Sequence, residues 1–165
     1  MIKRSFLYSI LMAICLPVAA FAQADIAFGG LKHDSSLPIE ISADQLSVDQ
    51  ASGQATFIGN VLIGQGDMRL SAGKVQVEYA TGADTKGEIS RLHASDGVTL
   101  VNGSEAAEAR EAVYTIETGT VIMTGDVILT QGPNALSSDK MTVNLRTGTG
   151  QMDGRVKSII QTGAN

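Results

Sequence analysis

Cysteine is almost absent from this 165-residue chain, and its single cysteine, Cys15, lies inside an apolar run near the N-terminus. If that run is removed, no thiol remains, which excludes a disulfide, a zinc–thiolate site and a cysteine nucleophile. Positive charge is also scarce. Beyond residue 22, ten basic residues face 17 acidic ones, which gives a net charge of −7. Because nucleic-acid binding requires a basic surface, the composition argues against that class of function.

The motifs of common catalytic and metal sites are missing as well. The sequence has no H-E-x-x-H, no G-x-S-x-G, no P-loop and no G-x-G-x-x-G that opens a helix. His33 and His93 are far apart and have no neighbour at metal-ligand spacing, so we interpret both as surface or loop residues. The sequence therefore predicts no catalytic residue, no metal site and no cofactor, and it favours a binding protein over an enzyme.

The first 22 residues have the pattern of a cleavable export signal. Lys3-Arg4 precedes an apolar run over residues 6–18, and residues 20–22 form an A-x-A cleavage site. The run is too short to span a membrane comfortably, which makes an uncleaved anchor the weaker alternative. A lipoprotein signal has a small residue before its cysteine, but Ile14 precedes Cys15. We therefore expect cleavage after Ala22 and export.

The remaining chain is rich in glycine and repeats itself with a period of 66 residues. The segment 53–63 aligns with 119–129 without a gap, and matches continue as far as Val77 and Val143. A fixed period indicates one supersecondary unit used twice, in which neither copy can bury its apolar face alone. The unit is a β-meander without a catalytic side chain, which points to a β-scaffold that binds something.

Apolar and polar residues alternate from Ile39 onward, as in half-buried strands. The stretch 105–110 has helical propensity, but its neighbours predict a strand. Four pairs predict hairpin turns between alternating runs, namely Gly59-Asn60, Asp96-Gly97, Asn102-Gly103 and Gly125-Asp126. About a dozen short strands, spaced roughly 8 to 12 residues apart, predict an all-β sandwich, jelly roll or barrel.

The expected organisation is a single β-domain between short terminal segments. The loop 81–87 connects the two repeat units, and a last strand is expected over 156–161, after the glycine-flanked stretch 148–154. The predicted parts are a signal peptide (1–22), a flexible leader (23–38), the β-domain (39–161) and a tail (162–165).

Alternation gives each strand one apolar and one polar face. The apolar residues are mostly Val, Leu, Ile, Met and Ala, with few aromatics. They are compatible with an ordinary core, and equally with an apolar slot for acyl chains between two opposed sheets. Periodicity alone does not separate these two interpretations.

An ordered set of residues resembles the LptA/OstA-like family over about residues 38–161. The middle stretch 89–100 contributes Ala94 and Gly97-Val98 to this resemblance. The first copy carries the pattern as Ala43-Asp44, Leu46, Val48-Asp49, Gly53, Phe57, Gly59-Asn60-Val61, Gly66, Leu70, Ala72, Val75, Val77 and Tyr79. The second copy carries it as Tyr114, Ile116-Glu117, Gly119, Met123-Thr124-Gly125-Asp126-Val127, Gln131-Gly132, Leu136, Asp139-Lys140 and Val143.

The resemblance implies an open, twisted, antiparallel β-jelly roll in the periplasm. It also implies a carrier that moves lipopolysaccharide from the inner to the outer membrane, with the acyl chains of lipid A in an apolar groove between two sheets. Members of the family join end to end and bridge an LptC-like inner-membrane protein to an LptD-like outer-membrane protein. Such a bridge needs no cofactor.

For this chain, the inward side chains of the strands are the expected groove. They are Phe57, Val61, Ile63, Leu70, Val77, Leu100, Met123, Val127, Leu129, Leu136 and Val143. A register shift of one residue would turn any strand's set outward. The first and last strands are the expected edges, where a partner adds a strand. Their candidate contacts are Ile39, Ile41, Leu46, Val156 and Ile159.

Alternatives remain within and outside the family. LptC-like domains keep a membrane helix and LptD-like domains continue into a large barrel; the cleavable signal and a chain ending at Asn165 argue against both. A structural β-repeat protein, such as a solenoid or adhesin, and a hydrolase on a jelly roll are the other classes. Co-purifying lipid would distinguish a carrier from either.

Overall fold

The computed structural model describes residues 26–27 and 29–161. The predicted signal peptide, with Cys15, and the predicted tail at 162–165 lie outside the described residues. No helix within the described part is long and apolar enough to cross a membrane.

The described chain is all-β, as predicted, and contains one 3-10 turn, η1 (Gly29–Leu31). Its twelve strands form a single antiparallel sheet. The strands are β1 (Ile26–Ala27), β2 (Glu40–Ser42), β3 (Gln45–Asp49), β4 (Gln54–Gln65), β5 (Met68–Tyr79), β6 (Ile89–Asn102), β7 (Glu105–Ala109), β8 (Glu111–Thr115), β9 (Thr120–Gln131), β10 (Asn134–Asn144), β11 (Thr149–Asp153) and β12 (Lys157–Ile159).

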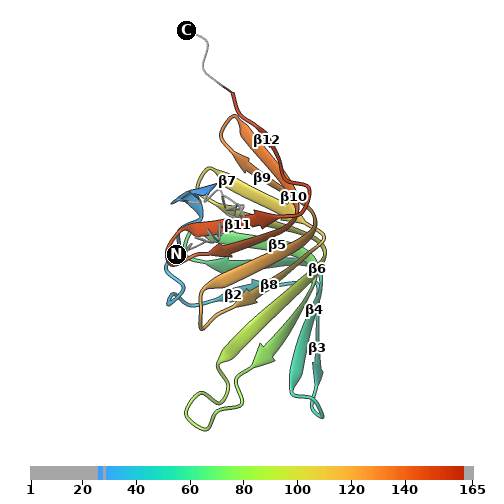
Figure 1. The fold of residues 1–165 in the computed structure, drawn as a ribbon. Coiled ribbons are helices and arrows are strands. Elements are labelled where there is room, and N and C mark those ends of the chain that lie inside the picture. Colours follow the sequence, from blue (N-terminus) through green and yellow to red (C-terminus); the bar gives the residue numbers. More distant parts are fainter. Residues whose placement is uncertain (1–25, 28, 162–165) are drawn as a thin grey trace, which may run out of the picture.

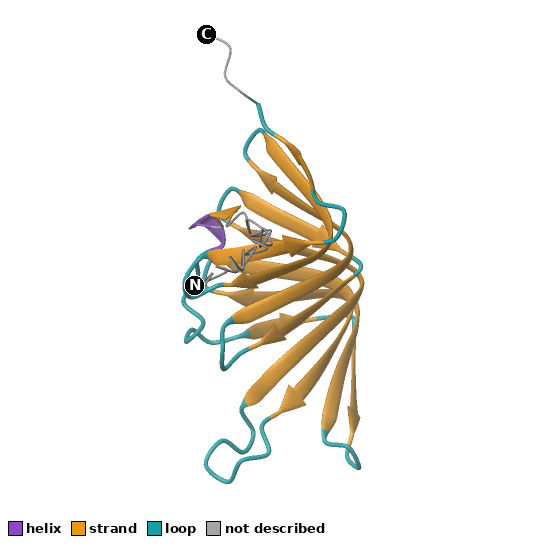
Figure 2. Ribbon diagram, viewed as in Figure 1, coloured by secondary structure: helices purple, strands orange, loops and turns teal. Residues whose placement is uncertain are grey.

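The long strands β4, β5, β6, β9 and β10 cross the whole sheet and bend near their middle, so that the sheet folds into two facing layers (Figure 1). Layer A contains β2, β7, β12 and the adjoining halves of the long strands, 61–65, 68–72, 98–102, 127–131 and 134–138. Layer B contains β1, β3, β8, β11 and the other halves, 54–58, 74–79, 89–95, 120–124 and 140–144. The bends line up as a crease, where the strands converge in Figure 2. This is the predicted jelly roll.

Three of the four predicted hairpin turns are bends within single strands, so those predictions were wrong. Gly59-Asn60 lies inside β4, Asp96-Gly97 inside β6 and Gly125-Asp126 inside β9. Both residues of each pair have positive φ, from 44° at Asn60 to 84° at Gly125. A tight hairpin requires the same left-handed pair, but here the pair forms a bulge that re-aims the strand from one layer to the other. Asn102-Gly103 is a true hairpin, between β6 and β7.

The repeat is visible as two equivalent hairpins, β4–β5 and β9–β10, whose first strands occupy 54–65 and 120–131, 66 positions apart. Beside the bends of β4 and β9, the neighbouring chain is divided into two short strands. The backbone N–H of Asp44, between β2 and β3, donates to the carbonyl of Gly59 at 2.9 Å, and the N–H of Arg110, between β7 and β8, donates to that of Gly125 at 3.0 Å. The same bend is therefore built in both copies.

Two segments are more ordered than the sequence predicts. The predicted flexible leader contains β1 and η1, and its Leu31 is completely buried. The glycine-flanked stretch 148–154 contains a further strand, β11. In β11 only Met152 is apolar, so no alternation marks this strand in the sequence. The leader is held by side chains from distant strands, and such contacts leave no local sequence pattern.

Candidate functional site

The interior between the two layers is a continuous apolar surface. Cross-strand pairs place apolar residues on the same inward face, for example Ile63 opposite Leu70 and Met123 opposite Met141. Side chains of both layers belong to one packed cluster. Each long strand has inward-facing side chains in both layers. This is possible because the bulge at its bend turns the side chains beyond the crease back toward the interior.

All predicted groove residues face this interior. Phe57 is half-buried and packs against the cluster. The others are buried: Val61, Ile63, Leu70, Val77, Leu100, Met123, Val127, Leu129, Leu136 and Val143. Their inward direction follows from the register pairs of β4 with β5, β5 with β6 and β9 with β10. That they contact lipid stays a prediction.

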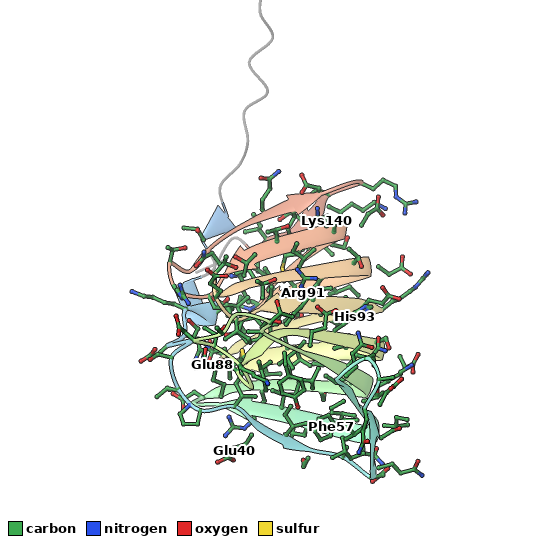
Figure 3. The ribbon with its side chains drawn as sticks, turned by 90° about the horizontal axis from the view of Figure 1, so that it is seen from below. Glu40, Phe57, Glu88, Arg91, His93 and Lys140 are labelled. Carbon is green, nitrogen blue, oxygen red and sulfur yellow. The ribbon has the colours of Figure 1, made fainter. Side chains whose placement is uncertain are left out.

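The interior is buried along the inner strands and exposed at the β2–β3 end. Around β9 and β10, Val127 and Val143 are completely buried. At the β2–β3 end, Leu46 and Val48 pair with inward residues of β4, yet they are 57% and 61% exposed. Figure 3 shows Phe57 at this end of the row of strands, with Lys140 at the opposite end. Apolar interior surface therefore reaches solvent at the β2–β3 end.

Buried polar residues are few, and those described have hydrogen-bond partners. Two buried atoms on partly buried residues, Nε2 of His33 and Oε2 of Glu105, have none among the described residues. Tyr114 on β8 donates its hydroxyl hydrogen to Oε1 of Gln65 on β4 at 2.9 Å, and both residues are buried. Burial raises the pKa of the Tyr114 hydroxyl to about 12. The other buried polar residues described are Ser35, Asn102 and Ser138, none of which is charged. Such an interior suits hydrocarbon better than a charged ligand.

The sheet has free edges at both ends within the described chain. β2 and β3 pair only with β4, and β12 pairs only with β10. Of the predicted edge contacts, Ile39 and Ile41 are half-buried beside β4. Leu46, Val156 and Ile159 are exposed, by 57%, 48% and 69%. Both ends therefore present unpaired backbone beside exposed apolar side chains, although contact with a partner there stays a prediction.

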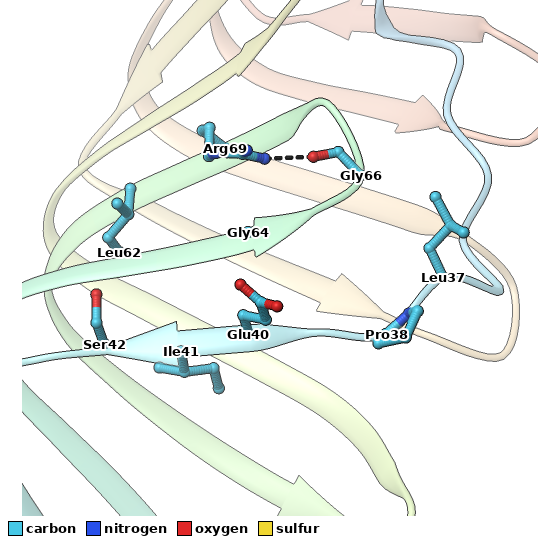
Figure 4. Close-up of a pocket in the computed structure, with 9 residues that line it drawn as sticks. All are labelled: Leu37, Pro38, Glu40, Ile41, Ser42, Leu62, Gly64, Gly66 and Arg69. Carbon is cyan, nitrogen blue, oxygen red and sulfur yellow. Dashed lines mark hydrogen bonds between the residues drawn. The ribbon is translucent and has the colours of Figure 1, made fainter.

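A separate hollow of about 580 Å³ lies on the outer face beside β2 (Figure 4). Glu40 and Arg69 flank it, and Leu62 supplies apolar surface. The Arg69 guanidinium is engaged with backbone, because it donates to the carbonyls of Gly66 and Met68. Leu62 pairs with Ser71 on the face opposite to the inward residues, so most of this hollow lies outside the interior. Ile41, which pairs with the inward Ile63, also lines it, at the edge between the two faces.

The structure places the two histidines apart from one another. His93, on β6, lies 3.8 Å from a carboxylate oxygen of Glu111. His33 lies in the segment before β2 and is half-buried. In the described part of the chain, no group of three or more His, Cys, Asp or Glu residues could hold a metal ion.

Sequence reasoning missed the buried polar residues. Gln65, Asn102 and Tyr114 are buried and bonded to partners distant in sequence. The only available signal was positional: Gln65-Gly66 recurs as Gln131-Gly132 in the second copy. That repeat marked a hairpin corner and gave no indication of a buried amide.

Comparison with known proteins identifies one family. Residues 40–149 match the family model described as LptA/(LptD N-terminal domain) LPS transport protein. An uncharacterized protein of Rhizobium meliloti is 31% identical over 148 residues, which are 84% of this chain and 80% of that protein. The lipopolysaccharide export system protein LptA of Escherichia coli K12 is 30% identical over 126 residues, 72% of this chain and 66% of that protein.

A solved structure has a similar architecture. The crystal structure of LptH, the LptA-homologous periplasmic component of the lipopolysaccharide transport device of Pseudomonas aeruginosa, superposes with a TM-score of 0.68. The match covers 78% of this chain and 98% of that one, at 16% identity. At that identity the likeness concerns the fold alone.

Proposed function

Because this chain belongs to the LptA/(LptD N-terminal domain) family of lipopolysaccharide transport proteins, we propose that it binds lipopolysaccharide in the periplasm and carries it toward the outer membrane. The acyl chains lie between layers A and B, shielded from water. The family is one of transport proteins, not of enzymes, and no chemical step is needed for this role.

The observation that carries this proposal is the continuous apolar interior that opens at the β2–β3 end. Transfer of an acyl chain from water into such a site gains about 0.8 kcal/mol per CH₂ group. Ten methylene groups therefore contribute about 8 kcal/mol, which offsets the cost of separating packed side chains. Phe57, Leu46 and Val48 extend this apolar surface to the solvent at the β2–β3 end.

The lipid headgroup stays in water. Without the predicted signal, the chain has a net charge of −7, which repels a phosphorylated sugar. Each buried polar residue described is uncharged, so the interior has no ion-pair partner for a phosphate. Affinity therefore comes from acyl burial, and the sugars remain outside the layers.

The free edges provide the means of forming a bridge. Unpaired edge strands accept a strand from another chain by β-augmentation. One copy's β12 edge joins the β2–β3 edge of the next, and the apolar residues beside each edge are covered at the joint. The same edges serve an LptC-like protein at the inner membrane and an LptD-like protein at the outer membrane.

Native mass spectrometry of the exported, processed protein, with and without added lipopolysaccharide, tests this proposal. We expect lipid adducts on monomers and on a ladder of oligomers. Phosphatidylglycerol at the same concentration is the control for nonspecific lipid uptake. A bare monomer that never takes up lipopolysaccharide would contradict the proposal and favour a structural β-domain.

A further inference from the structure

The segment 29–38, which we call the strap, crosses the side of the molecule opposite the crease. It leads from β1, at the edge of layer B, to β2, at the edge of layer A. Figure 1 shows this blue segment on one side of the sheet, and the strands converge at the crease on the other side. On this side the hairpin ends of layers A and B face each other, and we call the gap between them the mouth. The strap therefore lies across the mouth.

Layer A holds the first part of the strap through side chains at the β6–β7 hairpin. Nδ2 of Asn102 donates to the carbonyl of Gly30 at 2.9 Å and to that of Lys32 at 3.0 Å. Oε1 of Glu105 accepts from the N–H of Gly30 at 3.1 Å. Asn102 is itself buried, so this anchor is shielded from competing water.

Layer A holds the second part of the strap through Gln65. Its Nε2 donates to the carbonyls of Ser35 and Leu37 at 3.0 and 2.8 Å. Because Oε1 of Gln65 accepts from Tyr114, one buried amide links the strap to both layers.

Layer B holds the strap at the β10–β11 turn. The N–H of His33 donates to the carbonyl of Leu145 at 2.6 Å, and Nε of Arg146 donates to Oγ of Ser35 at 2.7 Å. The strap is thus bonded to hairpin ends of both layers, the ends that would separate if the mouth opened.

Leu31 is the apolar anchor of the strap. Its side chain is completely buried in the cluster between the layers, although it belongs to a short turn that lies against β6. Most of the described bonds between the strap and the sheet run from sheet side chains to strap backbone. Such bonds can break without disrupting any strand pair.

We propose that the strap is a lid on the lipid-binding interior and that the position of Leu31 is an acyl-chain subsite. Lipopolysaccharide enters sideways through the mouth, and an acyl chain displaces Leu31 as the strap lifts. The inference rests on the proposed function. Sideways entry fits the chemistry, because several acyl chains share one headgroup, and that headgroup must stay in water while the chains enter. Entry from the opposite side is blocked, because the sheet is continuous across the crease.

Backbone hydrogen exchange of the exported protein, with and without lipopolysaccharide, tests the lid. In the free protein the amides of Gly30 and His33 are protected by their bonds to Glu105 and Leu145. We expect their exchange to become at least tenfold faster in the complex, while amides of β9 and β10 keep their protection. Strap amides that stay protected in a lipid complex would overturn the lid and leave the carrier function intact. Failure to form any complex would overturn both proposals.

Variants of the anchors give a second test. Asn102→Ala frees the first part of the strap, and Ser35→Ala removes only the contact with Arg146. We expect both to associate with lipopolysaccharide at least threefold faster. Asn134→Ala is the matched control, because Asn134 accepts a hydrogen bond from Gln161, remote from the strap in sequence. A wild-type association rate in both folded variants, with faster strap exchange, would overturn the lid.

Discussion

Tyr114 and Gln65 join the two layers of the sheet across its interior, through a hydrogen bond of 2.9 Å from the tyrosine hydroxyl to the amide oxygen. Both residues are buried. The amide nitrogen of Gln65 also binds the strap carbonyls of Ser35 and Leu37. One buried polar group therefore couples layer A, layer B and the strap.

Tyr114→Phe should destabilise the fold by about 1 to 3 kcal/mol, because the buried amide oxygen of Gln65 loses its donor. Urea unfolding at neutral pH measures this change. Tyr79→Phe is the control, because Tyr79 is 39% exposed. Equal stability of the Tyr114 variant and the wild type would show that the link between the layers contributes nothing.

The same residue predicts a loss of stability at high pH. The pKa of Tyr114 is raised from 10.0 to about 12 by burial. Between these values the unfolded chain releases the proton and the folded chain retains it, so stability falls as pH rises from 10 toward 12. The wild type should therefore lose more stability than Tyr114→Phe between pH 9 and pH 11. If the urea midpoints of the two proteins fell by the same amount between pH 9 and pH 11, the raised pKa would not belong to Tyr114.

Phe57→Asp should weaken lipopolysaccharide binding at least tenfold, because it places a carboxylate on the apolar surface at the open end. Phe57 is half-buried, so the fold should persist, as circular dichroism would show. Ile58→Asp is a matched control, since Ile58 is 40% exposed on the opposite face of the same strand. Equal losses in both variants would argue against an interior binding site.

Ile159→Lys should reduce self-association at least tenfold, because a charge on an edge strand opposes strand addition. Ile159 is 69% exposed on β12, at the free edge. Ile128→Lys adds the same charge at an exposed position of β9, an inner strand, and should leave association unchanged. Concentration-dependent sedimentation compares the two. Unaltered oligomers of Ile159→Lys would mean that β12 is not the joining edge.

Gly59→Ala should cost more stability than Gly53→Ala, although both glycines have positive φ, 81° and 69°. A Cβ at Gly53 meets nothing within 4 Å, so that variant reports backbone strain alone, about 1 kcal/mol. A Cβ at Gly59 would lie 2.5 Å from Oδ2 of Asp44 and would displace a side chain that binds Asn60. We expect about 2 kcal/mol or more there. Equal costs would show that the crease tolerates the extra atom.

Alternation was enough to predict the all-β class and an apolar face on each strand, because most inward positions, such as Val127 and Leu129 on β9, are apolar. The choice of a jelly roll among sandwich, jelly roll and barrel came from the family resemblance. Alternation did not predict the bends. Gly59-Asn60 has the left-handed backbone preference of a hairpin turn, and only pairing with distant strands decides that the chain continues through it.

The strap was beyond local sequence reasoning for a similar reason. Leu31 stands alone among turn residues, so nothing near it indicates burial. Its anchors, Asn102 and Gln65, lie 72 and 30 residues from the strap carbonyls that they bind. Such contacts exist only after the two layers have folded together.

Photo-crosslinking to lipopolysaccharide from two adjacent positions tests the central claim most directly. p-Benzoylphenylalanine replaces Phe57, which faces the interior, or Ile58, which faces outward on the same strand. The account predicts a lipopolysaccharide adduct from position 57 and none from position 58. Adducts from position 58 alone, or equal adducts from both, would contradict the claim that the lipid lies between the two layers.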